Sequence, residues 1–479
     1  MTKVFVGGRL RRMREDRGYS QVGMARELSL SASYYNQIEN DERPLTAQLI
    51  VRVSELLKVD AQLFADDQEG RLIADMREAL IAAAPEETIS LAELREVAST
   101  MPGFARALIK IQNKHRGALE RVDLLTHQLD GARDSQSMSL PLMPHEEVRD
   151  FFYSRSNYID ELDQPAERIA GEESLRPGET FDALVKRMRR LHGVTVSIEH
   201  DDGGGVVLQR RYEKHKLVLS PSLTPTQRAF QVATQLAFLE VGDKIKRLAQ
   251  EATFSSDEAR ALARIGLAHH FAGALLMPYR AFLAAAEALH YDLDPLRRKF
   301  GVSYEMVCHR VSTLQRPNAQ GVPFFFLRVD RAGNISKRQS ATDFHFSRVG
   351  GTCPLWNVYE AFAQPGKVLV QLAQMPDGRT YLWIARAVSR GYGGHGSPSK
   401  TFSIALGCDV RHASRLVYSQ GLDLKAPAAI TPIGMGCKVC DRPACPQRAF
   451  PQMGRHVVVD ENRSHFEPYF AEPGAGAKR

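Results

Sequence analysis

The sequence lacks any hydrophobic run long enough to cross a membrane, because no stretch of about 18 apolar residues occurs in it. Its first residues, MTKVFVGGRLRRMRED, contain no apolar core of a secretory signal. We therefore expect a cytoplasmic protein without a membrane partner. Cysteine is also scarce, with 6 residues in 479. In a reducing compartment, clustered cysteines indicate metal or redox ligands before they indicate disulfides.

Internal repeats are absent as well, and a chain of 479 residues is too long for one hydrophobic core. The net charge of +7 suits a nucleic-acid partner. We expect a multidomain protein, mainly α with α+β parts. The expected order is an all-α domain over 1–65, a helical connector and linker over 66–145, an α+β domain over 146–316, and a mixed α/β domain over 317–470.

Strand patterns appear in two regions. TVSIEH and VVLQRRY flank DDGGG, which predicts a β-hairpin, and KLVLS follows as a third short strand. After residue 320, FFFLRVD, KVLVQLAQM and TYLWIARAV read as strands separated by turns rich in Gly and Pro. The polar, Pro-bearing stretch 130–146 is typical of a linker.

The first 60 residues predict three short amphipathic helices. Gly18 ends the first, Ser20 caps the second, and Ser31 caps the third. The pattern SQ-x-x-x-A-x-x-L, followed by S and Y-x-x-x-IEN-x-x-R-P, resembles the Cro/repressor-type helix-turn-helix family. That family places its recognition helix in the major groove and binds paired half-sites as dimers. We therefore expect double-stranded operator DNA as a partner and a homodimer or higher homo-oligomer.

Short polar groups on the third helix are suited to base edges, and basic residues near the first helix are suited to phosphates. The expected phosphate contacts are Lys3, Arg9, Arg11, Arg12, Arg14 and Arg17. The residues that we assign to DNA binding are Arg9, Arg12, Ser20, Gln21, Ser31, Ser33, Tyr34, Asn36, Gln37 and Arg43.

Cysteine side chains gather near the C-terminus, in GMGCKVCDRPACPQRAFP. Cys437, Cys440 and Cys445 have the spacing C-x2-C-x4-C, which lets thiolates meet one metal or cluster. A fourth ligand is expected, with Cys408 as first choice and Cys353 as second. Zinc and an iron–sulfur cluster both accept four thiolates, so both identities stay open here. Arg442 and Arg448 are placed to offset the thiolate charge, and Cys308 fits a helix core.

The stretches FAGALLMPYRAFL and FGVSYEMVCHRVSTL resemble the ImmA/IrrE-like metallopeptidase family. A zinc peptidase of this kind needs two His one turn apart with a Glu base. The corresponding positions within 228–240 are Thr234, Gln235 and Phe238, none of which is a His or a Glu. Neighbouring His269 and His270 point about 100° apart on a helix, so we do not expect them to share one ion. We therefore expect no enzyme activity, and a cleft suited to a ligand.

The domain opens with EEVRDFFYSRSNYIDELD, where aromatic residues lie among arginines. One interpretation is a core helix with aromatic knobs. The other is an effector site in which Arg155 and an aromatic ring sandwich an adenine or meet phosphate. The residues of this second interpretation are Phe151, Tyr153, Arg155 and Tyr158.

The whole set, with GGTCPLWNVYEAF and ALGCDVRHA added, resembles the short-chain fatty-acid metabolism regulators. The resemblance implies transcriptional control of propionate/methylcitrate or acetate/glyoxylate genes. It also implies an acyl-CoA or CoA effector in the middle domain and a [4Fe–4S] cluster on C-terminal cysteines. The alternatives are a regulator whose signal is the redox state of the cluster, and an active zinc peptidase that cleaves a partner.

Overall fold

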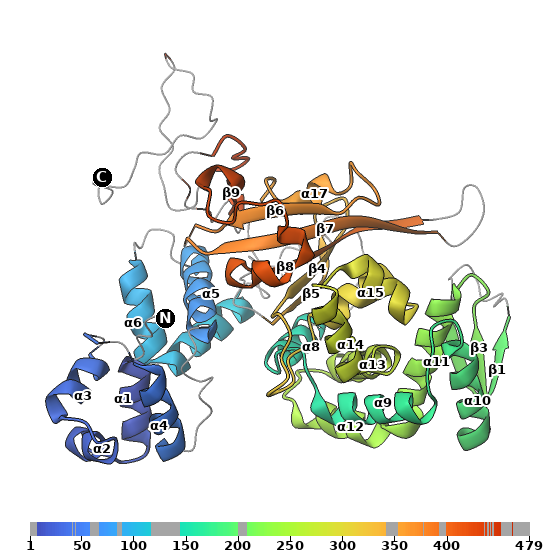
Figure 1. Ribbon diagram of the computed structural model, residues 1–479, viewed down its shortest axis with the longest axis horizontal. Helices are drawn as coiled ribbons and strands as arrows, with labels where there is room; N and C mark the ends of the chain where they lie inside the picture. Colours follow the sequence, from blue (N-terminus) through green and yellow to red (C-terminus); the bar gives the residue numbers. More distant parts are fainter. Residues whose placement is uncertain are drawn as a thin grey trace, which may run out of the picture. The chain divides into compact units, whose positions relative to one another are not determined.

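The computed structural model describes residues 7–40, 42–43, 45–57, 67–83, 89–115, 144–199, 208–341, 353–376, 378–391, 399–434, 436–437, 440, 442, 445–451 and 462. The chain divides into two compact units (Figure 1). The first comprises Met1–Gln136, Asp343–Gly351 and Met435–Arg479, and the second comprises Ser137–Thr342 and Thr352–Gly434.

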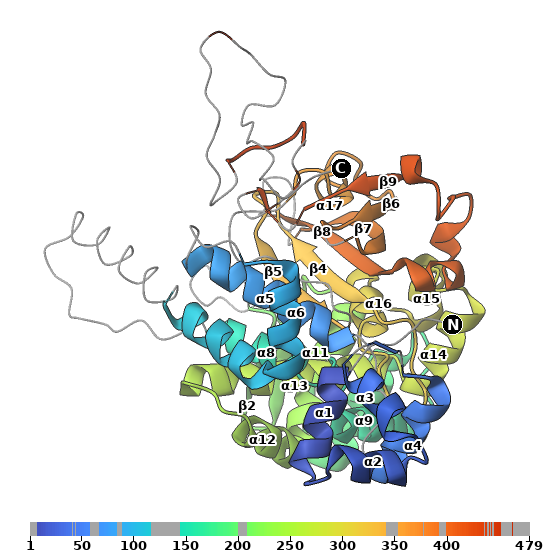
Figure 2. The ribbon, with the colours of Figure 1, turned by 90° about the vertical axis from the view of Figure 1, so that its left-hand side faces the viewer.

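Four short helices build the N-terminal bundle of the first unit (Figure 2): α1 (Gly7–Asp16), α2 (Gln21–Glu27), α3 (Ala32–Glu39) and α4 (Ala47–Leu57). The two predicted caps are confirmed, since Ser20 accepts from the Gly23 N–H and Ser31 from the Tyr34 N–H. The bundle closes on a small core of Leu10, Met24, Ala25, Leu28, Tyr35, Ile38, Leu45, Leu49, Val53 and Leu57. These contacts fix the angle between α2 and α3, as a helix-turn-helix requires.

Helices also fill the described part of the region expected to be a connector. They are α5 (Asp67–Ala83), α6 (Leu91–Thr100), which starts with a Ser90–Glu93 capping box, and a helix over 102–115. Met76, Leu94, Ala98 and Ala105 form their shared core. Helix α6 also contacts α1 of the bundle. The predicted linker, except its last three residues, lies outside the described residues.

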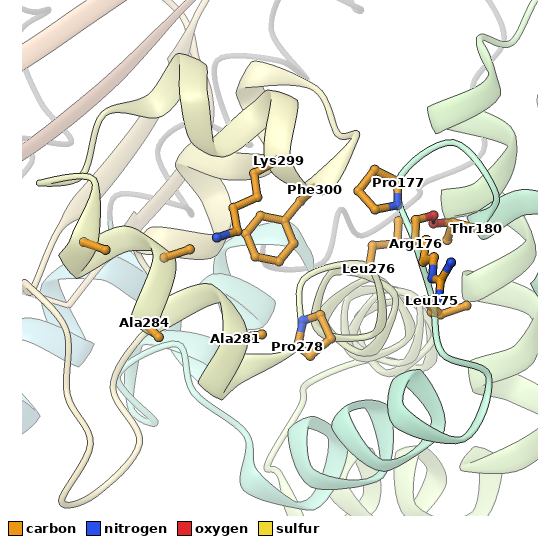
Figure 3. A pocket seen from close by; sticks show the side chains of 12 residues that line it. Leu175, Arg176, Pro177, Thr180, Leu276, Pro278, Ala281, Ala284, Lys299 and Phe300 are labelled. Carbon is orange, nitrogen blue, oxygen red and sulfur yellow. Dashed lines mark hydrogen bonds between the residues drawn. The ribbon is translucent and has the colours of Figure 1, made fainter.

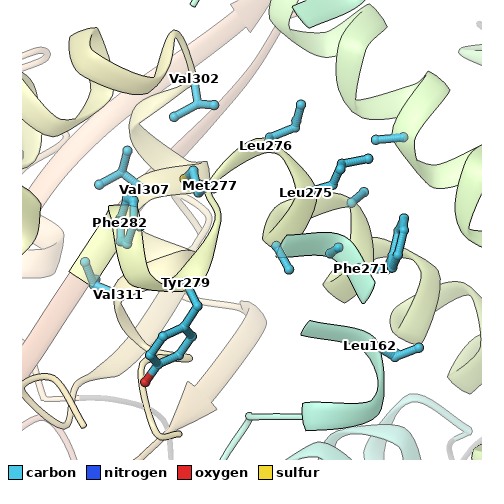
Figure 4. Packing of buried hydrophobic residues seen from close by; sticks show 14 of the residues in the cluster. Leu162, Phe271, Leu275, Leu276, Met277, Tyr279, Phe282, Val302, Val307 and Val311 are labelled. Carbon is cyan, nitrogen blue, oxygen red and sulfur yellow. The ribbon is translucent and has the colours of Figure 1, made fainter. Parts of the chain in front are cut away.

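The second unit begins with a helical domain. Its helices are α8 (Pro144–Tyr153), α9 (Asp160–Glu172), α10 (Thr180–His192), α11 (Pro225–Glu240), α12 (Gly242–Glu251), α13 (Asp257–Leu276), α14 (Tyr279–Ala288), α15 (Leu293–Phe300) and α16 (Tyr304–Val311). The long α13 is central, because α8, α9, α11 and α12 all pack on it. Its fully buried Phe271 and Leu275 contribute to the core that Figure 4 shows.

A small sheet lies beside α10 and α11 in Figure 1 and has the strand order β1-β3-β2. The strands are β1 (Thr195–Ile198), β2 (Arg210–Glu213) and β3 (Lys216–Leu219). The predicted hairpin between the first two strands is wrong, since β1 pairs with β3 in parallel and β2 pairs with β3. The tight turn is Lys214–His215, and both residues have positive φ (48° and 60°). Such turns usually carry Gly or Asn, so no residue type marked this turn in the sequence.

Six strands form the second sheet, in the order β5-β4-β8-β7-β6-β9. They are β4 (Phe325–Val329), β5 (Ile335–Ser340), β6 (Leu369–Gln374), β7 (Thr380–Gly391), β8 (Ser399–Asp409) and β9 (Ile430–Pro432), with the short α17 (Asn357–Glu360) against β6–β8. The three predicted strands are confirmed as β4, β6 and β7. Gly407 is required in β8, because a Cβ there would lie 1.9 Å from the Phe325 ring.

An ion pair crosses the interior of the helical domain. Arg310 donates from Nη1 and Nη2 to the Asp163 carboxylate at 2.7 and 3.0 Å, and from Nε to the Met277 carbonyl at 2.9 Å. Burial opposes the charged form of Asp163, but Arg310 holds the pKa of this carboxyl well below its usual range. Among the described helices, none is long and apolar enough to cross a bilayer.

Replacing Asp163 by Asn should destabilise this domain by about 3–5 kcal/mol, because Arg310 then stays buried without a counter-charge. The measurement is urea unfolding of the full chain, with transitions assigned separately. The matched control is Arg168→Ala in the exposed Arg168–Glu172 pair, which should change stability by about 0.5 kcal/mol or less. Since the Asp163 pKa is depressed, the stabilisation is complete above pH ~4 and falls as the pH drops further. Equal effects of the two variants would contradict the assignment.

Candidate DNA-binding surface, effector cleft and cysteine centre

The first turn of α3 is the exposed part of the helix-turn-helix. Ser31, Ser33 and Asn36 are exposed, and Tyr34 and Gln37 are half-buried. Ser20 is exposed at the start of α2. The hydroxyl oxygens of the two caps accept from backbone N–H groups, so their protons remain available to an outside acceptor.

A polar network holds this surface in place. The amide of Gln21 donates to Asn36 Oδ1 and to Glu39 Oε2, both at 2.9 Å. Glu39 is buried and also accepts from Arg14 Nε at 2.7 Å. The network joins α1, α2 and α3, so the two amides are held in one orientation towards solvent.

The expectation that Arg14 contacts phosphate is therefore wrong. Its side chain is buried and paired with Glu39 from α3, so it stabilises the bundle. Arg43 is exposed, with its guanidinium 5.4 Å from the Tyr34 ring. Lys3 and the side chains of Arg9 and Arg12 lie outside the described residues.

The helix predicted to correspond to the zinc-binding helix of a metallopeptidase is α11. Thr234 and Gln235 are buried in it, and Thr234 donates to the Phe230 carbonyl of the preceding turn. Phe238 lies under a cation, with the Arg210 guanidinium 5.8 Å from its ring. A hydroxyl, an amide and a ring supply no zinc site and no general base here.

The two adjacent histidines of α13 face different partners, as expected. The His269 ring packs on Phe230 at 5.4 Å, and His270 Nε2 lies 3.5 Å from Asp163 Oδ2. Burial lowers the pKa of His269 to about 4, and the charges of Lys337 and Arg210 add to this. His270 thus belongs to the buried ion-pair network rather than to a metal site.

Cations surround this part of the domain. Burial lowers the pKa of Lys337 to about 8, against the opposing effect of Glu305. Burial, with Lys337 as the next cause, also holds the pKa of His309 well below its ordinary value. No carboxylate is paired with Arg210 within the described part of the chain, and burial lowers its pKa. Arg210 and Lys337 therefore favour an anion over a metal cation near His269.

The aromatic segment at the end of α8 divides into two parts. Phe151 and Tyr158 are buried, and the Tyr158 hydroxyl donates to Asp160 at 2.5 Å while it accepts from Arg316 at 2.7 Å. Tyr153 and Arg155 are half-buried. The Arg155 guanidinium lies 4.1 Å from the Phe151 ring. The structure thus places the two buried rings in the core and brings Arg155 onto one of them.

A cavity of about 460 Å³ opens on another side of the same domain (Figure 3). Its lining comprises Leu175, Arg176, Pro177, Thr180, Leu276, Pro278, Ala281, Ala284, Ala285, Ala288, Lys299 and Phe300. None of the predicted effector residues lines it. It begins beyond the C-terminal end of α9, whereas Tyr158 precedes the N-terminal end, about 20 Å away along the helix.

The cysteines are divided between the two units. Cys437 and Cys440 are buried and Cys445 is half-buried, in the first unit. Cys353 and Cys408 are buried in the second unit, with Cys408 in β8 opposite Leu382 of β7. Cys308 is buried in α16 as expected. Among the described residues, no group of three or more His, Cys, Asp or Glu side chains is gathered closely enough to hold a metal ion.

The chemistry of the C-terminal loop nevertheless fits a thiolate-bound centre. Three cysteines fall within nine residues, and buried Arg448 lies among them. Arg448 donates to the carbonyl oxygens of Cys437 and Cys440, both at 3.1 Å. The sequence suggested a charge effect for Arg448 but carried no sign of these backbone contacts.

A capped helix-turn-helix together with a metallopeptidase-like domain that lacks zinc ligands defines a DNA-binding transcriptional regulator. Three family models match the chain: a helix-turn-helix domain over 6–66, an IrrE N-terminal-like domain over 189–312, and the C-terminal domain of the short-chain fatty acyl coenzyme A regulators over 313–469. The chain belongs to this last family of regulators of short-chain fatty acid metabolism.

Full-length relatives agree with this assignment. The HTH-type transcriptional regulators RamB and PrpR of Mycobacterium tuberculosis are each 47% identical to 98% of this chain, which spans 100% and 96% of their lengths. The propionyl-CoA carboxylase regulator of Cereibacter sphaeroides is 43% identical over 98% of both chains. These relatives are regulators rather than enzymes, as the sequence predicted. A solved Mycobacterium tuberculosis transcriptional regulator is 53% identical, with a TM-score of 0.65, and the match covers 68% of this chain and 99% of that one.

Replacing Arg43 by Ala should weaken DNA binding by a similar factor on every sequence, because a phosphate contact carries no base information. The slope of log K against log salt should fall by about 0.9. Fluorescence anisotropy with operator and random duplexes over a range of salt concentrations measures both. Arg264→Ala removes an exposed arginine of α13 and serves as the charge-matched control. A loss confined to the operator would mean that Arg43 reads bases instead.

Proposed function

We propose that the chain binds operator DNA as a homodimer or higher homo-oligomer and that a short-chain acyl-CoA, or CoA, changes its affinity for that DNA. The genes concerned are those of propionate/methylcitrate or acetate/glyoxylate metabolism. Support comes from the family description, which names a short-chain fatty acyl coenzyme A, and from a relative named for propionyl-CoA carboxylase. The DNA contacts are the α3 residues Ser31, Ser33, Tyr34, Asn36 and Gln37, with Ser20, Gln21 and Arg43 beside them and Arg9 and Arg12 on α1.

One observation carries the effector proposal: the half-buried Arg210 lies 5.8 Å from the ring of Phe238, the residue at which the sequence predicts a lost zinc ligand. CoA has several phosphate charges, and its acyl group is apolar. A half-buried cation beside a ring suits the first property, and the ring suits the second. The low pKa of His269 keeps this side chain neutral at pH 7, so it contributes a polar, uncharged surface to the proposed site.

The segment at the end of α8 supplies the second part of the proposed site. The Arg155 guanidinium lies 4.1 Å from the Phe151 ring, and an arginine plane can stack on an adenine ring. Tyr153 is half-buried in the same segment. Phe151 and Tyr158 provide the rigid support, since both are buried in the core. The effector site thus comprises Phe151, Tyr153, Arg155 and Tyr158, together with Arg210.

The second proposed ligand is a [4Fe–4S] cluster, with zinc as the alternative. Cys437, Cys440 and Cys445 would hold it, with Cys408 as the fourth ligand and Cys353 as the second choice for that position. A bound cluster would supply a redox-responsive centre, and zinc a structural one. Redox sensing is the second candidate function, and it is compatible with an acyl-CoA effector.

Arg155→Ala and Arg210→Ala should each raise, by about tenfold or more, the acyl-CoA concentration that gives a half-maximal change in DNA binding. The reason is the loss of a charged contact worth about 1.5–3 kcal/mol. The measurement is a gel shift titrated with acetyl-CoA, propionyl-CoA and CoA, and Arg264→Ala is the control. If none of these compounds changes DNA affinity, the effector proposal fails.

Protein purified without oxygen should carry iron and sulfide and show a broad visible absorption that dithionite bleaches. Cys440→Ser should lose this absorption, whereas Cys308→Ser should keep it because Cys308 lies in the core of α16. If the protein carries one equivalent of zinc and no iron, the centre is a zinc site rather than a cluster. If neither iron nor zinc is bound by thiolate, the proposed centre is rejected.

A further inference from the structure

A single residue, Arg448, holds together the described residues of the cysteine loop, which are 437, 440, 442 and 445–448. The side chain of Arg448 donates from Nη1 to the Cys437 carbonyl at 3.1 Å, and from Nη2 to the Cys440 carbonyl at 3.1 Å and the Arg442 carbonyl at 2.6 Å. Its own backbone N–H donates to the Cys445 carbonyl at 3.0 Å. One residue therefore bonds to the backbone of all three cysteines.

The charge of Arg448 is buried with the loop. Arg448 is 7% exposed, and Cys437 and Cys440 beside it are 9% and 7% exposed. The partners named above are neutral carbonyls, and no carboxylate is paired with this guanidinium within the described part of the chain. A buried cation without a counter-charge is unfavourable. Thiolates are the form in which cysteine binds metal, and they would supply the missing negative charge.

We propose that Arg448 is a positioning residue, which holds the backbone of Cys437, Cys440 and Cys445 together so that their thiols can close on one metal centre, and which balances the charge of that centre. This inference rests on the proposed thiolate-bound centre. Metal binding costs the loop little further conformational entropy, because its carbonyls are already fixed before the thiols bind the ion. The planar fork of arginine suits several carbonyls at once, whereas a lysine ammonium is a point charge.

The variants Arg448→Gln and Arg448→Lys separate these two roles. Gln loses both the charge and the fork, whereas Lys keeps the charge. Gln447→Ala is the matched control in the same loop, because the Gln447 side chain is exposed. Arg264→Gln controls for the loss of a surface charge.

The experiment titrates Co²⁺ alone into the reduced, metal-free full chain and follows the thiolate-to-cobalt charge-transfer absorption. The dissociation constant should rise at least tenfold in Arg448→Gln and by less in Arg448→Lys. Both controls should stay within about threefold of the parent. Equal dissociation constants for Arg448→Gln and the parent would overturn the inference. No cobalt–thiolate absorption in the parent, together with no thiolate-bound iron or zinc in the protein as purified, would instead reject the proposed centre itself.

Amide hydrogen exchange on the metal-free chain provides a second readout that does not need metal. The parent should protect the loop amides, that of Arg448 among them, and Arg448→Gln should lose this protection while α13 keeps its own. This pattern would separate a loosened loop from a chain that fails to fold. A parent loop that exchanges as fast as an unstructured peptide would overturn the inference.

Discussion

The helical domain of the second unit is organised around one buried ion pair, Asp163 with Arg310. Three elements meet there: α9 supplies the carboxylate, α16 the guanidinium, and the end of α13 the Met277 carbonyl that accepts from Arg310. Neither charge is tolerable in the interior alone, since an isolated buried ion costs several kcal/mol. The pair therefore fixes how these helices pack before any ligand is considered.

This ion pair also determines which side chains around α11 and α13 are available to a ligand. His270 faces Asp163 at 3.5 Å, so it is part of the ion-pair network. Arg316 extends the network, because it donates to the Tyr158 hydroxyl and to the Glu167 carboxylate. Groups that resemble metal ligands or ligand contacts in the sequence are thus engaged in holding helices together. What is left beside α11 is the Arg210 cation over the Phe238 ring, which favours an anionic ligand.

The sequence predicted those features that depend on neighbouring residues. Ser20 and Ser31 were found because a cap acts on an N–H three residues away. That Phe238 stands at a lost zinc-ligand position stays a prediction from its residue type at a helical spacing. Arg14 was misjudged because its partner, Glu39, is 25 residues away and only the fold brings them together. The contacts of Arg448 were missed since backbone carbonyls carry no sequence signature, and the β2–β3 turn was missed because Lys214–His215 takes the place of Gly or Asn.

A regulator of this design needs a ligand whose binding energy differs between a DNA-competent state and another state, because equal affinity for both would shift nothing. The proposed effector site suits this requirement, since its support is rigid and its cations are uncompensated. An anion that neutralises Arg210 removes the electrostatic penalty of this half-buried charge. The protein state that brings the anion closest to Arg210 gains most from it. Coupling of this kind is reciprocal, so operator DNA must change the affinity for acyl-CoA by the same factor as acyl-CoA changes that for DNA. Because α6 of the connector packs on α1, a change in the connector reaches the bundle that presents α3 through α1.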